Sequence, residues 1–168
     1  LDQWMLAKLQ DLSQILVSNL DAYTVMESAR AIRDFVTELS TWYVRRSRDR
    51  FKDSGEDAEY AVATTRLVLL EIAKIMAPFT PMFAEDIYQR IRGPLASVHL
   101  ESWPVVVSSG HDTLVLENMK ITRDIISQAL ELRARHHIKV RQPLSKLSIP
   151  EVRLDETYHE LIKDEVNI

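Results

Sequence analysis

Cysteine is absent from this chain of 168 residues, and glycine is scarce, with three residues in the whole sequence. Without cysteine the protein can form no disulfide bond, no thiolate metal site and no thiol nucleophile. Few glycines and six prolines leave little material for long loops. No apolar run approaches the roughly 18 residues of a membrane-spanning helix, so we expect no membrane contact.

The sequence also lacks the short motifs of common catalytic sites. It contains no glycine-rich phosphate loop, no His-Glu-x-x-His helix and no Gly-x-Ser-x-Gly turn. His136 and His137 are adjacent, and neighbouring side chains on a helix point about 100° apart, which is a poor arrangement for sharing a metal ion. We therefore expect neither catalysis nor a bound metal in this chain.

Apolar residues recur along most of the chain with the period of amphipathic helices. Thr24 and Thr80 have the pattern of helix N-caps, the first with Glu27 three residues later and the second with Pro81 directly after it. The third apolar segment has so wide an apolar surface that we expect it to pack on several sides. Helices are predicted at about 1–20, 25–51, 56–77, 82–91, 113–135 and 156–163.

Three shorter segments are predicted to be extended. Residues 98–104 are expected to form a short crossing loop or strand, 146–150 alternate as a short strand does, and 165–168 are expected to form a second strand. The predicted fold is mainly α: a helical bundle at 1–137, followed at 138–168 by the start of a small, partial α/β tail. Both chain ends lie inside such patterns, and we expect the sequence to be a piece of a longer protein.

The densest functional signal is the segment 41–52, which has five cations and one acid among aromatic residues. On a regular helix, Arg46 and Arg50 continue the apolar stripe of Tyr43, whereas Arg45 and Arg48 face the other way. Arginine contacts to phosphate and stacking of an aromatic ring on an unpaired base would make this a nucleic-acid surface.

An alternative explanation of the same segment is structural. The arginines would pair with acidic neighbours such as Asp53, Glu56 and Asp57, while Trp42 and Tyr43 would belong to the core. The formal net charge of −4 does not by itself indicate nucleic acid, but a local basic patch can bind phosphate on an acidic protein.

A second basic cluster follows the fifth predicted helix, and no acidic residue occurs from 134 to 149. Its members are Arg133, Arg135, His136, His137, Lys139, Arg141 and Lys146. The alternative here is a solvated linker between the bundle and the tail. Two basic clusters on a net-acidic chain indicate a polarised surface.

Four segments resemble the anticodon-binding region of isoleucyl-tRNA synthetases, in the family's order and at about its spacing. They are LDQWML at 1–6, WYVRRSR at 42–48, APFTP at 77–81 and IKVRQPL at 138–144. The first and third are shared with valyl and leucyl relatives, whereas the second and fourth are more specific to the isoleucyl branch. Residues 161–168 resemble the segment that follows in the family, where a small tail domain begins.

The resemblance implies a tRNA-binding domain of a cytoplasmic class I synthetase. The parent would activate isoleucine with ATP and Mg²⁺ and attach it to its tRNA, through catalytic and editing domains that this chain lacks. The resemblance leaves zinc in the parent open, and no cofactor is expected in this chain. The residues implied to bind tRNA are Trp42, Arg45, Arg46, Arg48, Arg50, Lys139, Arg141 and Gln142. The same domain from a valyl or leucyl relative and a helical protein-interaction module are the alternatives.

Overall fold

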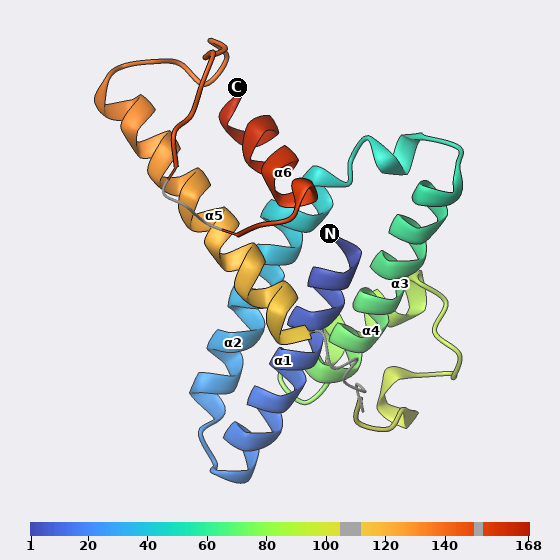
Figure 1. The fold of residues 1–168 in the computed structure, drawn as a ribbon. Coiled ribbons are helices and arrows are strands. Elements are labelled where there is room, and N and C mark those ends of the chain that lie inside the picture. The colour runs from blue at the N-terminus through green and yellow to red at the C-terminus, as the bar shows by residue number, and fades with distance from the viewer. Residues whose placement is uncertain (105–111, 150–152) are drawn as a thin grey trace. The chain divides into compact units, whose positions relative to one another are not determined.

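The structure, a computed structural model, describes residues 1–104, 112–149 and 153–168 and divides the chain into two compact units, Leu1–Asp112 and Thr113–Ile168. The regular elements of the described residues are all helical, which confirms the predicted mainly α fold (Figure 1). These units are defined by contacts between residues and do not test the predicted domain limits, 1–137 and 138–168. Those limits stay a prediction. Within the described residues, no helix has both the length and the apolar character for crossing a bilayer.

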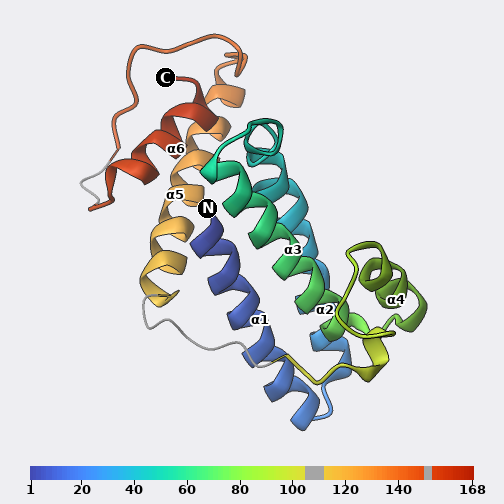
Figure 2. The same cartoon turned by 90° about the vertical axis from the view of Figure 1, so that its right-hand side faces the viewer.

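The first unit is a bundle in which α1 runs alongside both α2 and α3 (Figures 1 and 2). Helix α4 and the short turn η3 pack on α3. The elements of this unit are α1 (Asp2–Asp21), α2 (Val25–Glu38), the π-helical segment η1 (Leu39–Val44), the 3₁₀ turn η2 (Arg50–Lys52), α3 (Glu56–Met76), α4 (Pro81–Arg90) and the 3₁₀ turn η3 (Val98–Leu100).

The helical period of the sequence accounts for this packing. On α1, Met5, Leu9, Leu12 and Leu16 are almost fully buried and lie three or four residues apart, as one helix face requires. Helix α3 packs against α1, α4, η2 and η3, so the expectation that it is covered on several sides is confirmed. Thr80 is the N-cap residue of α4, with proline in the first turn as predicted.

The second unit contains α5 (Asp112–Arg135) and α6 (Glu156–Val166). The predicted helix 113–135 is confirmed, and residues 105–111 before it lie outside the described residues. On α5, Met119, Ile126 and Ala129 are buried.

The two strands predicted for the tail are wrong in the described residues. Residues 146–149 show alternating exposure, with Leu147 and Ile149 half-buried, but they form no ladder with a second strand; Pro150 lies outside the described residues. Helix α6 continues to Val166, so the first half of the second predicted strand, 165–168, is helical and the rest forms no strand. Exposure that alternates from one residue to the next indicates an extended backbone. A β-strand also needs a neighbouring strand to which it can hydrogen-bond.

The segment 98–104 is also more compact than predicted, because it begins with the turn η3. Glu85 on α4 accepts hydrogen bonds from the Ser97 hydroxyl and the Val98 amide, both at 2.9 Å. The Ser97 hydroxyl accepts a further one from the His99 amide at 3.2 Å. These three bonds fold the chain at a point where the sequence pattern indicated an extended segment.

In the part of the chain that the structure describes, four residues other than glycine adopt left-handed backbone conformations, and each stands at the end of an α-helix. They are Tyr23 (φ 58°), Arg92 (φ 54°), His137 (φ 55°) and Asn167 (φ 59°). After α1, the amide of Thr24 donates to Asn19 and that of Tyr23 donates to Leu20, the pattern of a Schellman cap. Glycine is the residue that usually occupies the left-handed position, and a side chain there costs about 1 kcal/mol.

We predict that Tyr23→Gly stabilises the first unit. Tyr23 is 90% exposed, so its side chain has little packing to lose. The expected gain is about 0.5–1 kcal/mol, or a rise in Tm of roughly 2–4 °C for a chain of this size. Thermal unfolding followed by circular dichroism measures it. Tyr23→Ala is the control, since alanine keeps the Cβ; an equal gain from alanine would show that backbone strain is not the cause.

Candidate nucleic-acid interface

The π-helical segment η1 determines which side of the basic stretch faces the core. Phe35, Leu39, Tyr43 and Ser47 are all buried, with at most 6% exposure, although they are spaced by four residues three times in succession. In a regular α-helix each such interval drifts about 40° around the axis. The i→i+5 bonding of a π-helix accommodates one more residue per turn, which keeps these positions on one face. Val36 lies off this face and is 39% exposed.

Trp42 and Arg45 lie next to each other on the outer side of this turn. The guanidinium carbon of Arg45 is 5.7 Å from the centre of the Trp42 ring, a cation–π distance. Arg45 is exposed and its Nε donates to the main-chain oxygen of Thr41 at 2.8 Å, whereas Trp42 is half-buried. An aromatic ring and a guanidinium held side by side suit an unstacked base and its phosphate.

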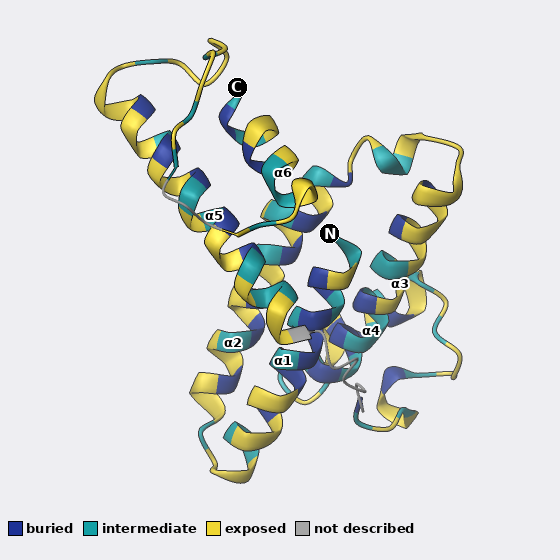
Figure 3. Cartoon of the chain, viewed as in Figure 1, coloured by how far each residue is buried: buried dark blue, intermediate teal, exposed yellow. Residues whose placement is uncertain are grey.

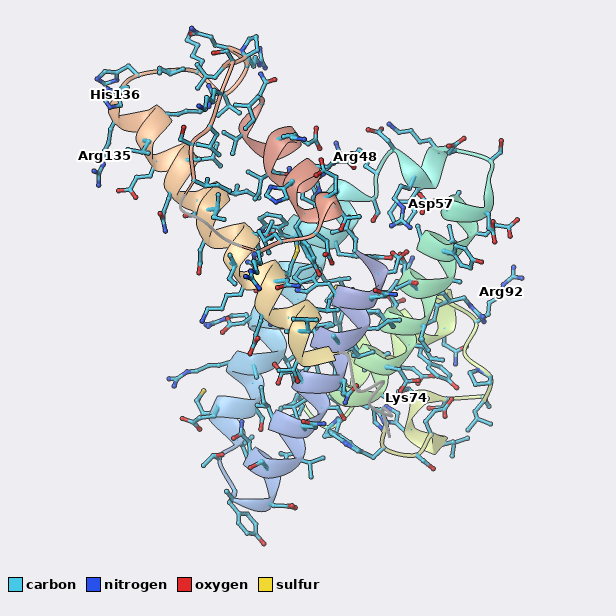
Figure 4. All side chains as sticks on the ribbon, viewed as in Figure 1. Arg48, Asp57, Lys74, Arg92, Arg135 and His136 are labelled. Atoms are coloured by element: carbon cyan, nitrogen blue, oxygen red, sulfur yellow. The ribbon has the colours of Figure 1, made fainter. Side chains whose placement is uncertain are left out.

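Arg46 and Arg48 differ in exposure. Arg46 is half-buried, and Arg48 is exposed (Figure 4). Lys52, at the end of η2, pairs with Asp49 at 3.0 Å on the open surface. The structure therefore places Arg45 and Arg48 where a large partner can reach them.

Arg50 is held in a different way, because carboxylates bind its guanidinium on two sides. Its Nη1 and Nη2 donate to the two carboxylate oxygens of Asp2 at 2.9 and 2.7 Å. Its Nε and Nη2 donate to those of Asp57 at 2.7 and 2.8 Å. Asp2 opens α1 and Asp57 lies in the first turn of α3 (Figure 4), so Arg50 joins three elements. This is the structural alternative that the sequence left open, and a tRNA contact of Arg50 stays a prediction.

The carboxylate of Asp2 has a second partner in the buried hydroxyl of Tyr43, which donates to it at 2.7 Å. Burial would raise the pKa of Asp2, but the hydrogen bonds from Arg50 and Tyr43 outweigh it and lower the pKa below its ordinary value. Burial and the bond to Asp2 raise the pKa of Tyr43 to about 12. The hydrogen bonds from Arg50 likewise lower the pKa of Asp57. The network therefore holds the carboxylates ionised and the phenol protonated.

The second predicted motif lies on the loop after α5, in the other compact unit. Lys139, Arg141 and Gln142 are all exposed there, and the amide of Gln142 donates to the main-chain oxygen of Lys139 at 2.9 Å, closing a turn. The two basic segments belong to different units, and each is described as a separate surface. Within the described residues, no group of three or more histidine or acidic side chains is placed to hold a metal ion.

The sequence offered Asp57 as a partner of the arginines, but it revealed neither the bond of Arg50 to Asp2 nor the structural role of Arg133. Arg133 was predicted to belong to an exposed basic cluster, yet its exposure is 3%. A signal was present, since Arg133 lies four residues after the buried Ala129 and seven after the buried Ile126. Figure 3 shows how such buried positions alternate with exposed ones along α5.

Comparisons with known proteins match this chain to one domain of much larger enzymes. Residues 2–148 match the family model of the anticodon-binding domain of tRNA ligase. Over its whole length the chain is 40% identical to isoleucine–tRNA ligase 2 of Bacillus thuringiensis subsp. konkukian and 38% identical to isoleucine–tRNA ligase of Clostridium novyi. It is 35% identical over 89% of its length to isoleucine–tRNA ligase of Deinococcus radiodurans. The chain spans 17% of the first two relatives and 14% of the third.

We predict that Arg50→Met destabilises the first unit by about 2 kcal/mol, because it leaves the half-buried carboxylate of Asp2 without its cation. Urea unfolding followed by circular dichroism measures the change. Arg48→Met is the matched control: the same charge is removed from an exposed position, and the expected change is within about 0.5 kcal/mol. Equal effects of the two substitutions would mean that the Asp2–Arg50–Asp57 network adds nothing.

Acid should weaken the same network. Asp2 and Asp57 have folded-state pKa values below the ordinary value of 3.8, so their contribution is present above that pH and is lost as the pH falls through the folded values. We predict that the free energy of unfolding declines from about pH 5 to about pH 2, and less steeply in Asp2→Asn. Urea titrations across this range test it. Asp21→Asn, at the exposed end of α1, should keep the wild-type slope, and an unaltered slope in Asp2→Asn would contradict the assignment.

Proposed function

The chain belongs to the family of anticodon-binding domains of tRNA ligases, and on that premise we propose that it binds the anticodon stem and loop of isoleucine tRNA. The relatives that support isoleucine are the ligases of Bacillus, Clostridium and Deinococcus. The segments WYVRRSR and IKVRQPL support the same amino acid, since they resemble the isoleucyl branch more than the valyl or leucyl one.

The observation that carries the proposal is the outward surface of the π-helical turn. It combines an aromatic ring, Trp42, with a guanidinium stacked beside it at 5.7 Å, and the exposed Arg48 follows within one turn. Such a combination matches what an RNA loop offers: phosphates, which position the partner, and splayed bases, which stack. A surface for another protein would more often be apolar and less charged.

Rigidity is the second requirement, and the network behind the surface supplies it. Asp2 and Asp57 hold Arg50 in place at the end of the same helical stretch, and Tyr43 donates to Asp2 from within the π-helical turn. A surface fixed to α1 and α3 can hold a tRNA in register. Loss of orientation by about 1 Å can lower a reaction rate a hundredfold even when the reacting groups are distant.

The parent enzyme, in this proposal, is a cytoplasmic isoleucine–tRNA ligase. Its catalytic domain would activate isoleucine with ATP and Mg²⁺ and transfer it to the tRNA, and an editing domain would accompany it in the same chain. The present chain would contribute tRNA binding and no chemistry of its own. Affinity of the isolated domain is expected to be modest, because contacts from several domains combine in the whole enzyme.

The test is a titration of the chain with isoleucine tRNA and with a tRNA of different anticodon, each at two salt concentrations. We predict salt-dependent binding that favours isoleucine tRNA. Arg45→Ala/Arg48→Ala should weaken it and reduce the slope of log affinity against log salt by about 0.7–0.9 for each phosphate that is no longer neutralised. Arg30→Ala/Arg33→Ala is the matched control: both arginines lie on α2 outside the basic segment, with Arg33 exposed beside Asp34 and Arg30 beside Glu27, and the slope should hardly change.

Each other outcome has a definite meaning. Salt-dependent binding with no preference between the two tRNAs would leave a backbone-binding domain whose specificity lies elsewhere in the parent. Equal effects of the two double variants would show that general charge, and not the π-helical surface, attracts the tRNA. Absence of binding at low salt would overturn the proposal for this chain and favour a protein-interaction module.

A further inference from the structure

Arg133 is a buried cation in the last turn of α5. Its exposure is 3%, and it continues the buried positions Met119, Thr122, Ile126 and Ala129 of that helix. Removing a guanidinium from water is costly unless its donors find acceptors. Burial of Arg133 therefore depends on the oxygen atoms that surround it.

Three main-chain carbonyl oxygens accept hydrogen bonds from Arg133. Nη1 donates to the oxygens of Lys139 at 3.1 Å and Gln142 at 2.9 Å. Nη2 donates to the oxygen of Asn167, at the end of α6, at 3.1 Å. The planar fork of a guanidinium can serve several acceptors at once, which the single ammonium of a lysine does less well. One side chain thus fixes both ends of the turn 139–142.

Asn167 holds the same loop from the other side. Its side-chain Nδ2 donates to the main-chain oxygen of Val140 at 2.9 Å. Its main-chain oxygen accepts a hydrogen bond from the amide of Leu144 at 3.1 Å. The carbonyls of 139, 140 and 142 are therefore all used by internal anchors. The side chains of Lys139, Arg141 and Gln142 are left exposed. Arg135 and His136 point outward from the end of α5 (Figure 4).

We propose that Arg133 is a positioning residue for tRNA binding: by holding the carbonyls of the loop 139–144 inward, it presents Lys139 and Arg141 to the phosphates of the tRNA. This inference rests on the proposed function and adds a buried residue that touches no tRNA itself. The loop reaches its form through the Arg133 and Asn167 bonds and the turn between Gln142 and Lys139. Without the guanidinium, the two exposed cations remain but lose their fixed separation.

The experiment is a double-mutant cycle on the 168-residue chain, with isoleucine tRNA as the probe. Lys139→Ala/Arg141→Ala should lower the affinity roughly tenfold, because two phosphates are no longer neutralised. Arg133→Met should lower it by a similar factor although no exposed charge is removed. The combined variant should bind little more weakly than either alone, because both changes act on the same interaction with tRNA. Lys120→Met, which removes an exposed charge from the same helix, is the matched control and should stay near wild type.

Hydrogen exchange supplies a readout that does not depend on tRNA. In Arg133→Met, the amides of Gln142 and Leu144 should exchange about tenfold faster or more, while α1 to α4 keep their protection. Should Arg133→Met fail to fold, Arg133→Lys and Asn167→Gly take its place. Lysine keeps the charge with fewer donors, and glycine keeps the left-handed backbone at 167 (φ 59°) without the side-chain amide. Both should show the same effects in weaker form.

The outcomes separate this inference from the function on which it rests. Unchanged affinity in Arg133→Met, or effects that add in the combined variant, would overturn the positioning role while leaving tRNA binding in place. If Lys139→Ala/Arg141→Ala binds as wild type does, the loop does not touch tRNA, and the inference fails with it. The affinity of Arg45→Ala/Arg48→Ala for isoleucine tRNA would then still show whether the first basic segment binds tRNA.

Discussion

The carboxylate of Asp2 is the constraint on which the first unit depends. It accepts hydrogen bonds from Arg50 and from the buried hydroxyl of Tyr43, so residues more than 40 positions apart in the sequence meet at the start of α1. Arg50 extends the network to Asp57 on α3. Because the bonds around Asp2 are charged and partly shielded from water, each is stronger than an exposed ion pair. They fix the end of the helical stretch whose outer side carries Trp42 and Arg45.

The sequence predicted most of the helices well, because the 3.6-residue period of apolar side chains survives even where tertiary contacts vary; the predicted helix 25–51, however, is divided into α2, η1 and η2. Two other failures concern long-range pairing, which a local pattern does not contain. Alternation at 146–149 indicated a strand, yet no described segment supplies a ladder. Glu85 folds the turn η3 from another helix. In the candidate site, the exposure of Arg45 and Arg48 agrees with the helical projection, and the sequence offered Asp57 as a partner of the arginines. The bonds of Arg50 to Asp2 and of Arg133 to main-chain oxygens needed the fold.

Scarcity of glycine has a visible effect on the backbone. Helix ends that commonly use glycine are formed here by Tyr23, Arg92, His137 and Asn167, all with positive φ. Asparagine tolerates this conformation better than the others, since its short polar side chain can bond locally. The side chain of Asn167 bonds instead to a distant residue, the main-chain oxygen of Val140, which makes a strained position part of the hydrogen bonding around the loop 139–144.

The π-helical turn has a consequence for how this surface can change in evolution. Because the π-helical turn absorbs one extra residue, deleting one residue between Leu39 and Val44 would leave an α-helix in which Arg45 and Arg48 keep about their present direction. Substitutions that turned the segment into an α-helix without a deletion would instead rotate everything that follows by about 100°, and different side chains would take their place on the outside. Among related domains, a single gap in this segment would therefore leave the surface of Arg45 and Arg48 in place, whereas loss of the π-helical turn without a gap would redirect it.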